Sequence, residues 1–358
     1  MNVLIVLACV VQDGVSFEEK KLATAPADAE VTIAAFSLDG RSVAFVARAK
    51  SESVVFGDRA GDAFDKVQSL VISPDGKTVA YTGFEGFRHY VVVGDKKSPS
   101  YGGAKGLVFG PDGKRFAYAA RGEKSTDWFV VLDGKKGPDF ADVDAPVFSP
   151  DGATLGYGAA AGEGTVLVLG ERKIETGDGV DGPAWSADGK TLGYAVAKGE
   201  RWQVVIGEKK GEEFDEVLRP VFAPKGDAFA YPARTGRRWC IVVGSNKGPD
   251  YQFVGAPVLG PDGSVVAHRA SAGLKWCIVV GDKAGAAFDQ VGQPVFSPDG
   301  KTVAYPARKG LKWHLVAGEK AGEEFDFVGP PVFSPDGKRV AFGARSGSEL
   351  WWKVVDVK

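Results

Sequence analysis

Nine lysines and arginines gather in four short segments between residues 198 and 312, where Glu200 is the one acidic residue among them. Ammonium and guanidinium groups at this density bind carboxylates, phosphates or sulfates. Each segment separates two apolar runs, so we expect the cations to lie on surface loops. The predicted binding residues are Lys198, Arg201, Arg234, Arg237, Arg238, Lys275, Arg308, Lys309 and Lys312. The alternative interpretation is an ordinary solvated rim, in which these cations pair with acids such as Asp289.

No catalytic constellation accompanies these cations. The sequence has no Gly-x-Ser-x-Gly elbow between a strand and a helix, and no further domain that a fused peptidase would need. His89, His268 and His314 stand in different parts of the chain without a second metal ligand at suitable spacing, and we interpret His268 as a substitute for a core aromatic residue. Residues 177–182 hint at a calcium loop but lack the other ligands of an EF-hand. We therefore predict no enzymatic activity, no metal site and no cofactor.

Two further residue types recur with a period of 37. A series of tryptophans at this spacing is either a stacking platform for sugars or bases, or packing between repeats, and we favour packing. The series is Trp202, Trp239, Trp276 and Trp313. Cys240 and Cys277 occupy equivalent places in neighbouring repeats. Equivalent atoms there are expected to lie beyond the roughly 7 Å between Cα atoms that a disulfide spans, so we interpret both as small buried hydrophobes.

These periodicities reflect a repeat that covers most of the chain. In Ser297-Pro298-Asp299-Gly300, proline suits the second position of a type I turn, aspartate the third, and glycine the left-handed residue that follows. The turn recurs at steps of 36 to 39 residues, mostly 37, and such a period indicates a repeat architecture. The residues at the aspartate position, each followed by glycine, are Asp39, Asp75, Asp112, Asp151, Asp188, Lys225, Asp262, Asp299 and Asp336.

One repeat contains four predicted strands, at residues 293–297, 301–306, 312–317 and 325–328. Four antiparallel strands in about 37 residues form one blade of a β-propeller. We predict an all-β chain with a single closed propeller of nine blades over residues 26–358; the alternative is a ring of eight blades with one repeat displaced. The last repeat lacks an outer strand, and we expect residues 27–31 to supply it by pairing with residues 350–357.

Residues 1–25 precede the repeats as a leader or an extra strand. The apolar run at residues 3–11 resembles the core of an export signal, although no positive residue stands before it. The expected location is therefore cytoplasmic, or periplasm or cell envelope if residues 1–11 act as a signal. The 358 residues carry a net charge of −2, which implies no nucleic-acid or membrane partner, and no apolar run reaches the roughly 18 residues of a membrane span.

The repeated pattern Phe-Ser-Pro-Asp-Gly-Lys-x-Val-Ala-Tyr resembles the WD-repeat-like propeller repeat of TolB type. The resemblance covers about nine-tenths of the chain and is clearest at residues 147–157, 295–305 and 332–342. It implies a propeller of the kind often found in bacterial envelope or multiprotein settings. The same repeats also form gating propellers fused to serine peptidases. The family has no general catalytic residues to carry over.

We therefore predict a monomeric, non-enzymatic binding or protein-interaction scaffold. The nine cations, here called the basic arc, are expected to lie side by side on one face and to bind an acidic protein segment or an anionic polymer. Two alternatives stay open. A hydrolase or lyase sited in the central channel would show a buried cluster of Asp, His or Arg converging there. A carbohydrate-binding propeller would expose the rings of Trp239 and Trp276.

Overall fold

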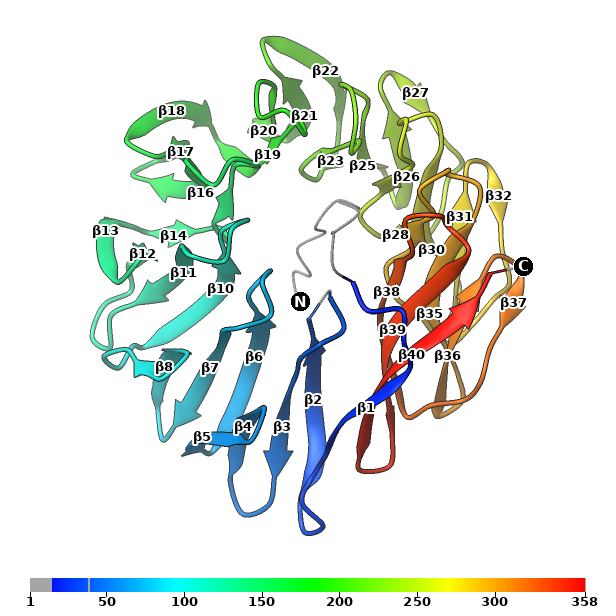
Figure 1. The fold of residues 1–358 in the computed structure, drawn as a ribbon. Coiled ribbons are helices and arrows are strands. Elements are labelled where there is room, and N and C mark those ends of the chain that lie inside the picture. The colour runs from blue at the N-terminus through cyan, green and yellow to red at the C-terminus, as the bar shows by residue number, and fades with distance from the viewer. Residues whose placement is uncertain (1–14, 38, 358) are drawn as a thin grey trace.

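A ring of nine antiparallel sheets surrounds a central axis in the computed structural model, which describes residues 15–37 and 39–357 (Figure 1). Each sheet is one blade, with its first strand next to the axis and its fourth at the periphery. The prediction of a nine-bladed β-propeller is confirmed. Among the described residues, no helix has the length and apolar character needed to cross a membrane. The apolar run at residues 3–11 lies outside the described residues.

The first and second strands of each blade form its inner half. A turn joins the first strand to the second, and a hairpin joins the second strand to the third. The first strands are β2 (Glu30–Phe36), β6 (Lys66–Ile72), β10 (Gly103–Phe109), β14 and β15 (Asp142–Val143, Val147–Phe148), β19 (Gly179–Trp185), β23 and β24 (Glu216–Val217, Val221–Phe222), β28 and β29 (Phe253–Val254, Val258–Leu259), β33 and β34 (Gln290–Val291, Val295–Phe296) and β38 (Phe327–Phe333). The second strands are β3 (Val43–Arg48), β7 (Val79–Glu85), β11 (Phe116–Arg121), β16 (Leu155–Ala161), β20 (Leu192–Lys198), β25 (Phe229–Thr235), β30 (Val266–Ala272), β35 (Val303–Lys309) and β39 (Arg339–Ser346).

The outer half of each blade is less regular. The third strands are β4 (Glu52–Phe56), β8 (Arg88–Val93), β12 (Trp128–Leu132), β17 (Gly164–Leu169), β21 (Arg201–Ile206), β26 (Arg238–Val243), β31 (Lys275–Val280), β36 (Lys312–Ala317) and β40 (Glu349–Asp356). The fourth strands are β5 (Arg59–Phe64), β9 (Lys96–Lys97), β13 (Lys135–Phe140), β18 (Arg172–Gly177), β22 (Lys209–Phe214), β27 (Asn246–Lys247), β32 (Lys283–Ala284), β37 (Lys320–Ala321) and, for blade nine, β1 (Lys20–Thr24).

The repeated turn is held by its own side chains. The Ser297 hydroxyl donates to Asp299 Oδ1 (2.6 Å), and the same oxygen accepts the N–H of Lys301 (3.1 Å). The N–H of Thr302 returns to Ser297 Oγ (2.9 Å), and Gly300 completes the turn at φ 72°. The Ser297 hydroxyl, with the Lys301 N–H, holds the pKa of the Asp299 carboxyl below its usual value. The carboxylates of these turns therefore have a structural role.

The hydrophobic core lies between blades. An aromatic residue at the end of one blade packs edge-on against the aromatic residue of the next blade's second strand, at centroid distances of 5.6 to 6.4 Å. Phe288 and Tyr305 form one such pair, among the small alanines and valines of blades seven and eight. His268 takes the tyrosine position in blade seven, is buried and packs on Tyr251, as expected for an aromatic substitute. These contacts make each blade depend on its neighbours.

The fourth strand is not where the sequence placed it. Residues 325–328 were expected to form it, but Lys320–Ala321 does so, and Phe325 adds one isolated bridge to Trp313. Phe327 and Val328 instead begin the first strand of blade nine. Several first strands are bulged or split at a proline such as Pro294, which has no backbone N–H to donate to the neighbouring strand. The residues before the proline therefore resemble a separate strand in the sequence.

The same misassignment affected the closing strand. We expected residues 27–31 to pair with the last third strand, but β1 at Lys20–Thr24 does so, beside β40 (Figure 1). Trp352 completes the junction: it is 1% exposed, its Nε1 donates to the Ser16 carbonyl (2.7 Å), and its indole lies directly over Gly40 of blade one. The ring is therefore closed by segments from both ends of the described chain.

Removal of the Trp352 indole should open this junction. W352A is expected to lower the free energy of unfolding by about 3–5 kcal/mol, since it leaves a large cavity between blades nine and one. W351A is the matched control, because Trp351 is half-buried on the opposite side of the same strand and should cost far less. Thermal unfolding followed by circular dichroism measures both, and equal losses would contradict closure through Trp352.

Candidate functional site

One face of the ring carries the hairpins between second and third strands, and we call it the hairpin face. The connections between blades lie on the same face, because a connection residue accepts the N–H of the glycine at the tip of the next blade's hairpin. These bonds join Asp65 to Gly86, Asp178 to Gly199, Asp215 to Gly236, Gln252 to Gly273, Asp289 to Gly310 and Asp326 to Gly347, at 2.6 to 3.0 Å. The basic arc therefore lies on this face, in blades five to eight.

Three of these aspartates bind a cation as well. Asp326 Oδ1 accepts from Lys312 Nζ of the preceding blade (2.7 Å) while Oδ2 accepts from Gly347. Asp289 joins Lys275 to Gly310 in the same way, and Asp215 joins Arg201 to Gly236. The paired lysine is the main reason that the pKa values of Asp289 and Asp326 lie below the usual value. We call this arrangement the aspartate clamp, since one carboxylate connects the hairpins of two adjacent blades.

The structure divides the basic arc into paired and unpaired residues. Arg201, Lys275 and Lys312 belong to clamps, and Arg234 pairs with Glu216 (2.9 Å). Arg308 is half-buried against Trp313, and its buried Nε has no hydrogen-bond partner among the described residues. The residues that form no ion pair with any described residue are Lys198, Arg237, Arg238, Arg308 and Lys309. The constant 14-residue step from cation to clamp aspartate was a signal for this pairing in the sequence.

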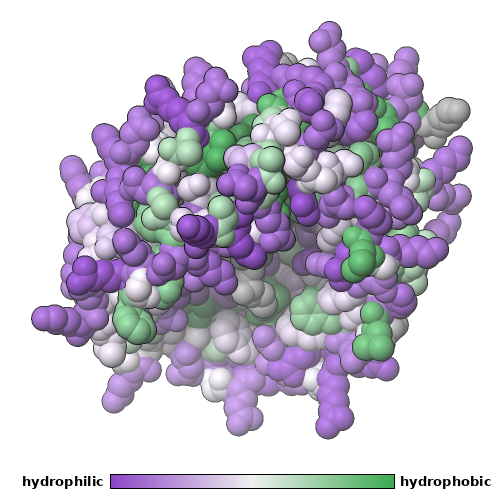
Figure 2. All heavy atoms as spheres, turned by 90° about the horizontal axis from the view of Figure 1, so that it is seen from below, coloured by the Kyte–Doolittle hydropathy of each residue, from purple (hydrophilic) through white to green (hydrophobic). Residues whose placement is uncertain are grey.

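Large apolar side chains project from the same face. Leu274 and Leu311, at the hairpin tips of blades seven and eight, are 94% and 88% exposed. Phe253 is 42% exposed and packs on Trp239 (6.2 Å) and Trp276 (5.5 Å). Hydrophilic side chains cover most of the surface in Figure 2, with hydrophobic groups exposed at separate points. Sequence reasoning missed these groups, although Leu274 and Leu311 each stand directly before a basic-arc cation, which identifies them as loop residues.

The tryptophan series lies inside the blade interfaces. All four rings are half-buried and contact hydrophobic clusters that two adjacent blades share. This agrees with the packing interpretation and leaves no row of fully exposed rings for stacking sugars. Cys240 is buried and Cys277 half-buried, both as free thiols.

A second charged group lies on the innermost strands of blades three to six. Asp144 and Asp181 occupy equivalent bulges of blades four and five, with Lys105 and Arg219 in the blades on either side. Arg219 pairs with Asp181 (Nε to Oδ1, 3.5 Å) and donates its backbone N–H to the same carboxylate (2.9 Å). Lys105 pairs with Asp142 (2.9 Å). Sequence reasoning missed this cluster, whose signal is four charges at nearly one repeat position in consecutive blades.

Asp144 forms no ion pair with any described residue. Its Oδ2 is buried, has no hydrogen-bond partner within residues 15–37 and 39–357, and lies only 2.3 Å from the position that a Cβ on Gly158 would take. Burial, and then the like charge of Asp181, raises the pKa of Asp144 to about 7. Arg219 and Lys105 oppose the shift but do not cancel it. At neutral pH this side chain therefore exists in both protonation states.

The suspected calcium loop is accounted for by the repeat. Asp178 accepts the N–H of Gly199, and Asp181 pairs with Arg219, so both carboxylates of residues 177–182 have structural partners. Within residues 15–37 and 39–357, no three His, Cys, Asp or Glu side chains form a group suited to a metal ion.

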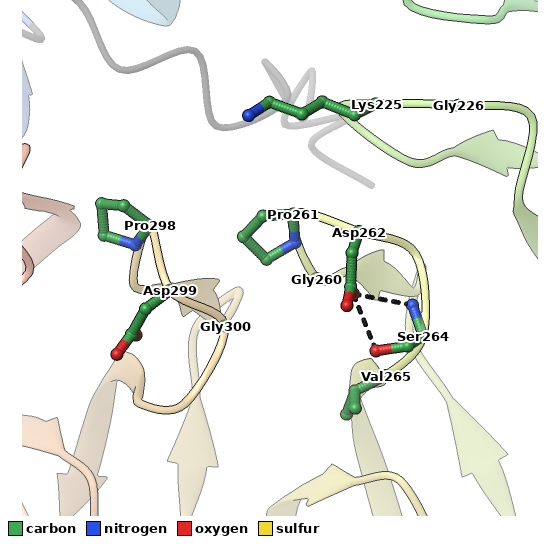
Figure 3. Close-up of a pocket in the computed structure, with 10 residues that line it drawn as sticks. All are labelled: Lys225, Gly226, Gly260, Pro261, Asp262, Ser264, Val265, Pro298, Asp299 and Gly300. Carbon is green, nitrogen blue, oxygen red and sulfur yellow. Dashed lines mark hydrogen bonds between the residues drawn. The ribbon is translucent and has the colours of Figure 1, made fainter.

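The opposite face has a hollow of about 520 Å³ between the turns of blades six, seven and eight (Figure 3). Lys225 extends away from its own turn there, whereas Asp262 folds back to the N–H and hydroxyl of Ser264 (2.9 and 2.7 Å). In the turn of blade six, Ala223 and Lys225 stand where Ser297 and Asp299 stand in blade eight. This turn therefore lacks both partners of the serine–aspartate hydrogen bond. Among the residues that line the hollow, Lys225 is the one cation, and the two carboxylates, Asp262 and Asp299, are hydrogen-bonded within their own turns.

Comparison with known proteins supports the fold alone. No protein-family model matches the chain, and no curated protein matches it either. A crystal structure of the eukaryotic initiation factor aligns with 86% of this chain and 94% of its own, with a TM-score of 0.52 and 12% identity. Oligogalacturonate lyase from Vibrio parahaemolyticus gives 0.40 and 11%, covering 83% and 98%, and the Dos1 propeller gives 0.41 and 8%, covering 94% and 95%. The resemblance to TolB-type repeats stays a prediction.

The position of Asp144 predicts a pH-dependent stability. A carboxyl whose pKa rises from 3.8 to about 7 on folding ionises first in the unfolded chain, so the folded state loses stability as the pH rises from about 4 to 7. D144N should remove this loss and, at pH 8, raise the free energy of unfolding by on the order of 2 kcal/mol. D227N, at an exposed site, controls for the change in charge. Parallel slopes in D144N and the wild type would contradict the raised pKa.

Proposed function

We propose that this chain is a non-enzymatic binding scaffold that holds an anionic partner on the hairpin face of blades five to eight. The observation that carries the proposal is the set of exposed cations that form no ion pair with any described residue, Lys198, Arg237, Arg238 and Lys309. They lie on the same face as Arg201, Lys275 and Lys312, which the clamp aspartates neutralise. Like charges held near one another repel, and an anionic partner removes that repulsion. The predicted TolB-type resemblance, often seen in multiprotein settings, agrees with a scaffold.

The ring suits such a role because it fixes the hairpins before binding. Clamps at Asp215, Asp289 and Asp326 tie neighbouring hairpins together, so little conformational entropy is lost when a partner binds. Exposed cations are screened over about 8 Å at physiological ionic strength, so binding should weaken with added salt. The complex is therefore expected to be steered by charge and stabilised by contacts that salt does not screen.

An enzyme sited at the inner wall is the second candidate, favoured by one observation. Asp144, with a pKa near 7, lies beside ionised groups that include Asp181 and Arg219, which is a suitable environment for acid–base chemistry. Against it, Asp181, Arg219 and Lys105 already have ion-pair partners. Turnover of a glycoside or ester panel by the wild type, lost in D144N, would favour this candidate over the scaffold.

Neutralising the unpaired cations tests the scaffold directly. A variant with Lys198, Arg237, Arg238 and Lys309 changed to serine should lose at least about tenfold in affinity for an Asp-rich peptide, measured by fluorescence anisotropy at low salt. The control changes four exposed lysines of the opposite face, Lys77, Lys114, Lys301 and Lys338, to serine and alters the net charge equally. Equal losses in both variants would show non-specific attraction and would contradict a site on the hairpin face.

A further inference from the structure

The interface between blades six and seven differs from its neighbours in one charged residue. The cations Arg201, Arg238, Lys275 and Lys312 occupy the same repeat position, and three of them bind a clamp aspartate 14 residues later. The residue 14 positions after Arg238 is Gln252. Its Oε1 still accepts the N–H of Gly273 (3.0 Å), so the structural half of the clamp is kept. The carboxylate that would neutralise Arg238 is missing from the chain.

A second replacement lies one blade further on. Glu30 pairs with Arg48 and Glu216 with Arg234, at equivalent cross-strand positions of blades one and six. In blade eight the partner of Arg308 is Gln290, and the buried Nε of Arg308 has no hydrogen-bond acceptor. Two glutamines in adjacent connections thus leave Arg238 without the acid of the clamps and Arg308 without the acid that blades one and six place opposite the equivalent arginine. Both lie on the hairpin face, on either side of blade seven.

The surroundings of Arg238 and Arg308 are the most apolar exposed part of this face. Leu274 and Leu311 project from the hairpin tips of blades seven and eight, and Phe253 lies beside Gln252 in the sequence and is partly exposed. Exposed apolar side chains that gather in one sector, unlike single scattered ones, indicate a site of contact with a partner, and three of the five large hydrophobic residues exposed in the described chain belong to blades seven and eight. Charge and apolar surface therefore coincide at the place where the clamp lacks its carboxylate.

We propose that the hairpin face of blades six to eight binds an acidic protein segment with bulky apolar side chains, whose carboxylates pair with Arg238 and Arg308 and whose apolar groups pack on Leu274 and Phe253. This inference rests on the proposed function and names the partner's chemistry. A carboxylate from the segment takes the role that Asp289 has at the next interface. A sulfated or phosphorylated polymer satisfies the arginines but leaves the leucines in water, so a protein segment is the better match.

The test compares two fluorescein-labelled peptides, one of alternating Asp and Leu and one of alternating Asp and Ser, by anisotropy. The wild type should bind the Asp-Leu peptide at least about tenfold more tightly. Q252D supplies the missing carboxylate within the chain and should weaken that binding by a similar factor, while K114Q makes the same change in net charge on the opposite face and should not. Q252D is expected to fold, since aspartate is native at five equivalent positions.

A matched pair of tip variants isolates the apolar contribution. L274S should lower affinity for the Asp-Leu peptide but not for the Asp-Ser peptide, whereas F87S, at the equivalent tip of blade two and 95% exposed, should change neither. The variant with Lys198, Arg237, Arg238 and Lys309 changed to serine separates the two proposals. If both peptides bind alike and L274S has no effect while this serine variant binds more weakly, the segment is wrong and the anion site stands. If heparin binds more tightly than the Asp-Leu peptide, a polyanion replaces the segment. If the serine variant binds normally, the proposed function itself fails.

Discussion

Closure of the ring is the constraint on which the rest of the molecule depends. A blade has two apolar faces and covers neither alone, so each of the nine needs a neighbour on both sides. The final junction joins blades whose sequences lie at opposite ends of the repeats, through β1 beside β40 and the Trp352 indole over Gly40. Because the ring is closed, hairpins from residues that are hundreds of positions apart share one rigid face. No disulfide or helix among the described residues contributes to that rigidity.

The charges of the hairpin face are largely balanced within the chain. Clamp aspartates neutralise Arg201, Lys275 and Lys312 and fix adjacent hairpins to each other. Their regularity gives meaning to the exception at Gln252, since the other three basic-arc cations at that repeat position each have an aspartate 14 residues later. Residues at the same repeat position in different blades can thus be compared with one another. We infer function where one blade lacks a residue that its neighbours use to hold the fold. The inner-wall cluster around Asp144 is another such departure. It is marked by the raised pKa of a buried carboxyl and not by an exposed surface.

The fold was predictable because its signals are local. Turn chemistry, strand period and nine copies of Pro-Asp-Gly or its variants are visible in the sequence, and they determine the architecture. The closing strand was misplaced because Pro330 and Pro331 lie at a bulge of the first strand of blade nine, so that Phe327 and Val328 resembled the end of blade eight and the same phase was applied to residues 27–31. The basic-arc residues lie on the hairpin face, but their pairing depends on side-chain reach across blades. Lys105 and Asp181 lie at bulges of first strands, and Asp144 and Arg219 lie between the two halves of split first strands. Their only signal in the sequence is recurrence at nearly one repeat position, which no local motif accompanies.

The most direct measurement is a crystal structure of the protein with the Asp-Leu peptide bound. We predict a peptide carboxylate within hydrogen-bond distance of the Arg238 guanidinium, in the place relative to its blade that the Asp289 carboxylate has beside Lys275. A leucine of the peptide should contact Leu274 or Phe253. A peptide bound at the inner wall or on the opposite face, with Arg238 turned toward an acid of its own chain, would contradict the assignment of this face as the binding surface.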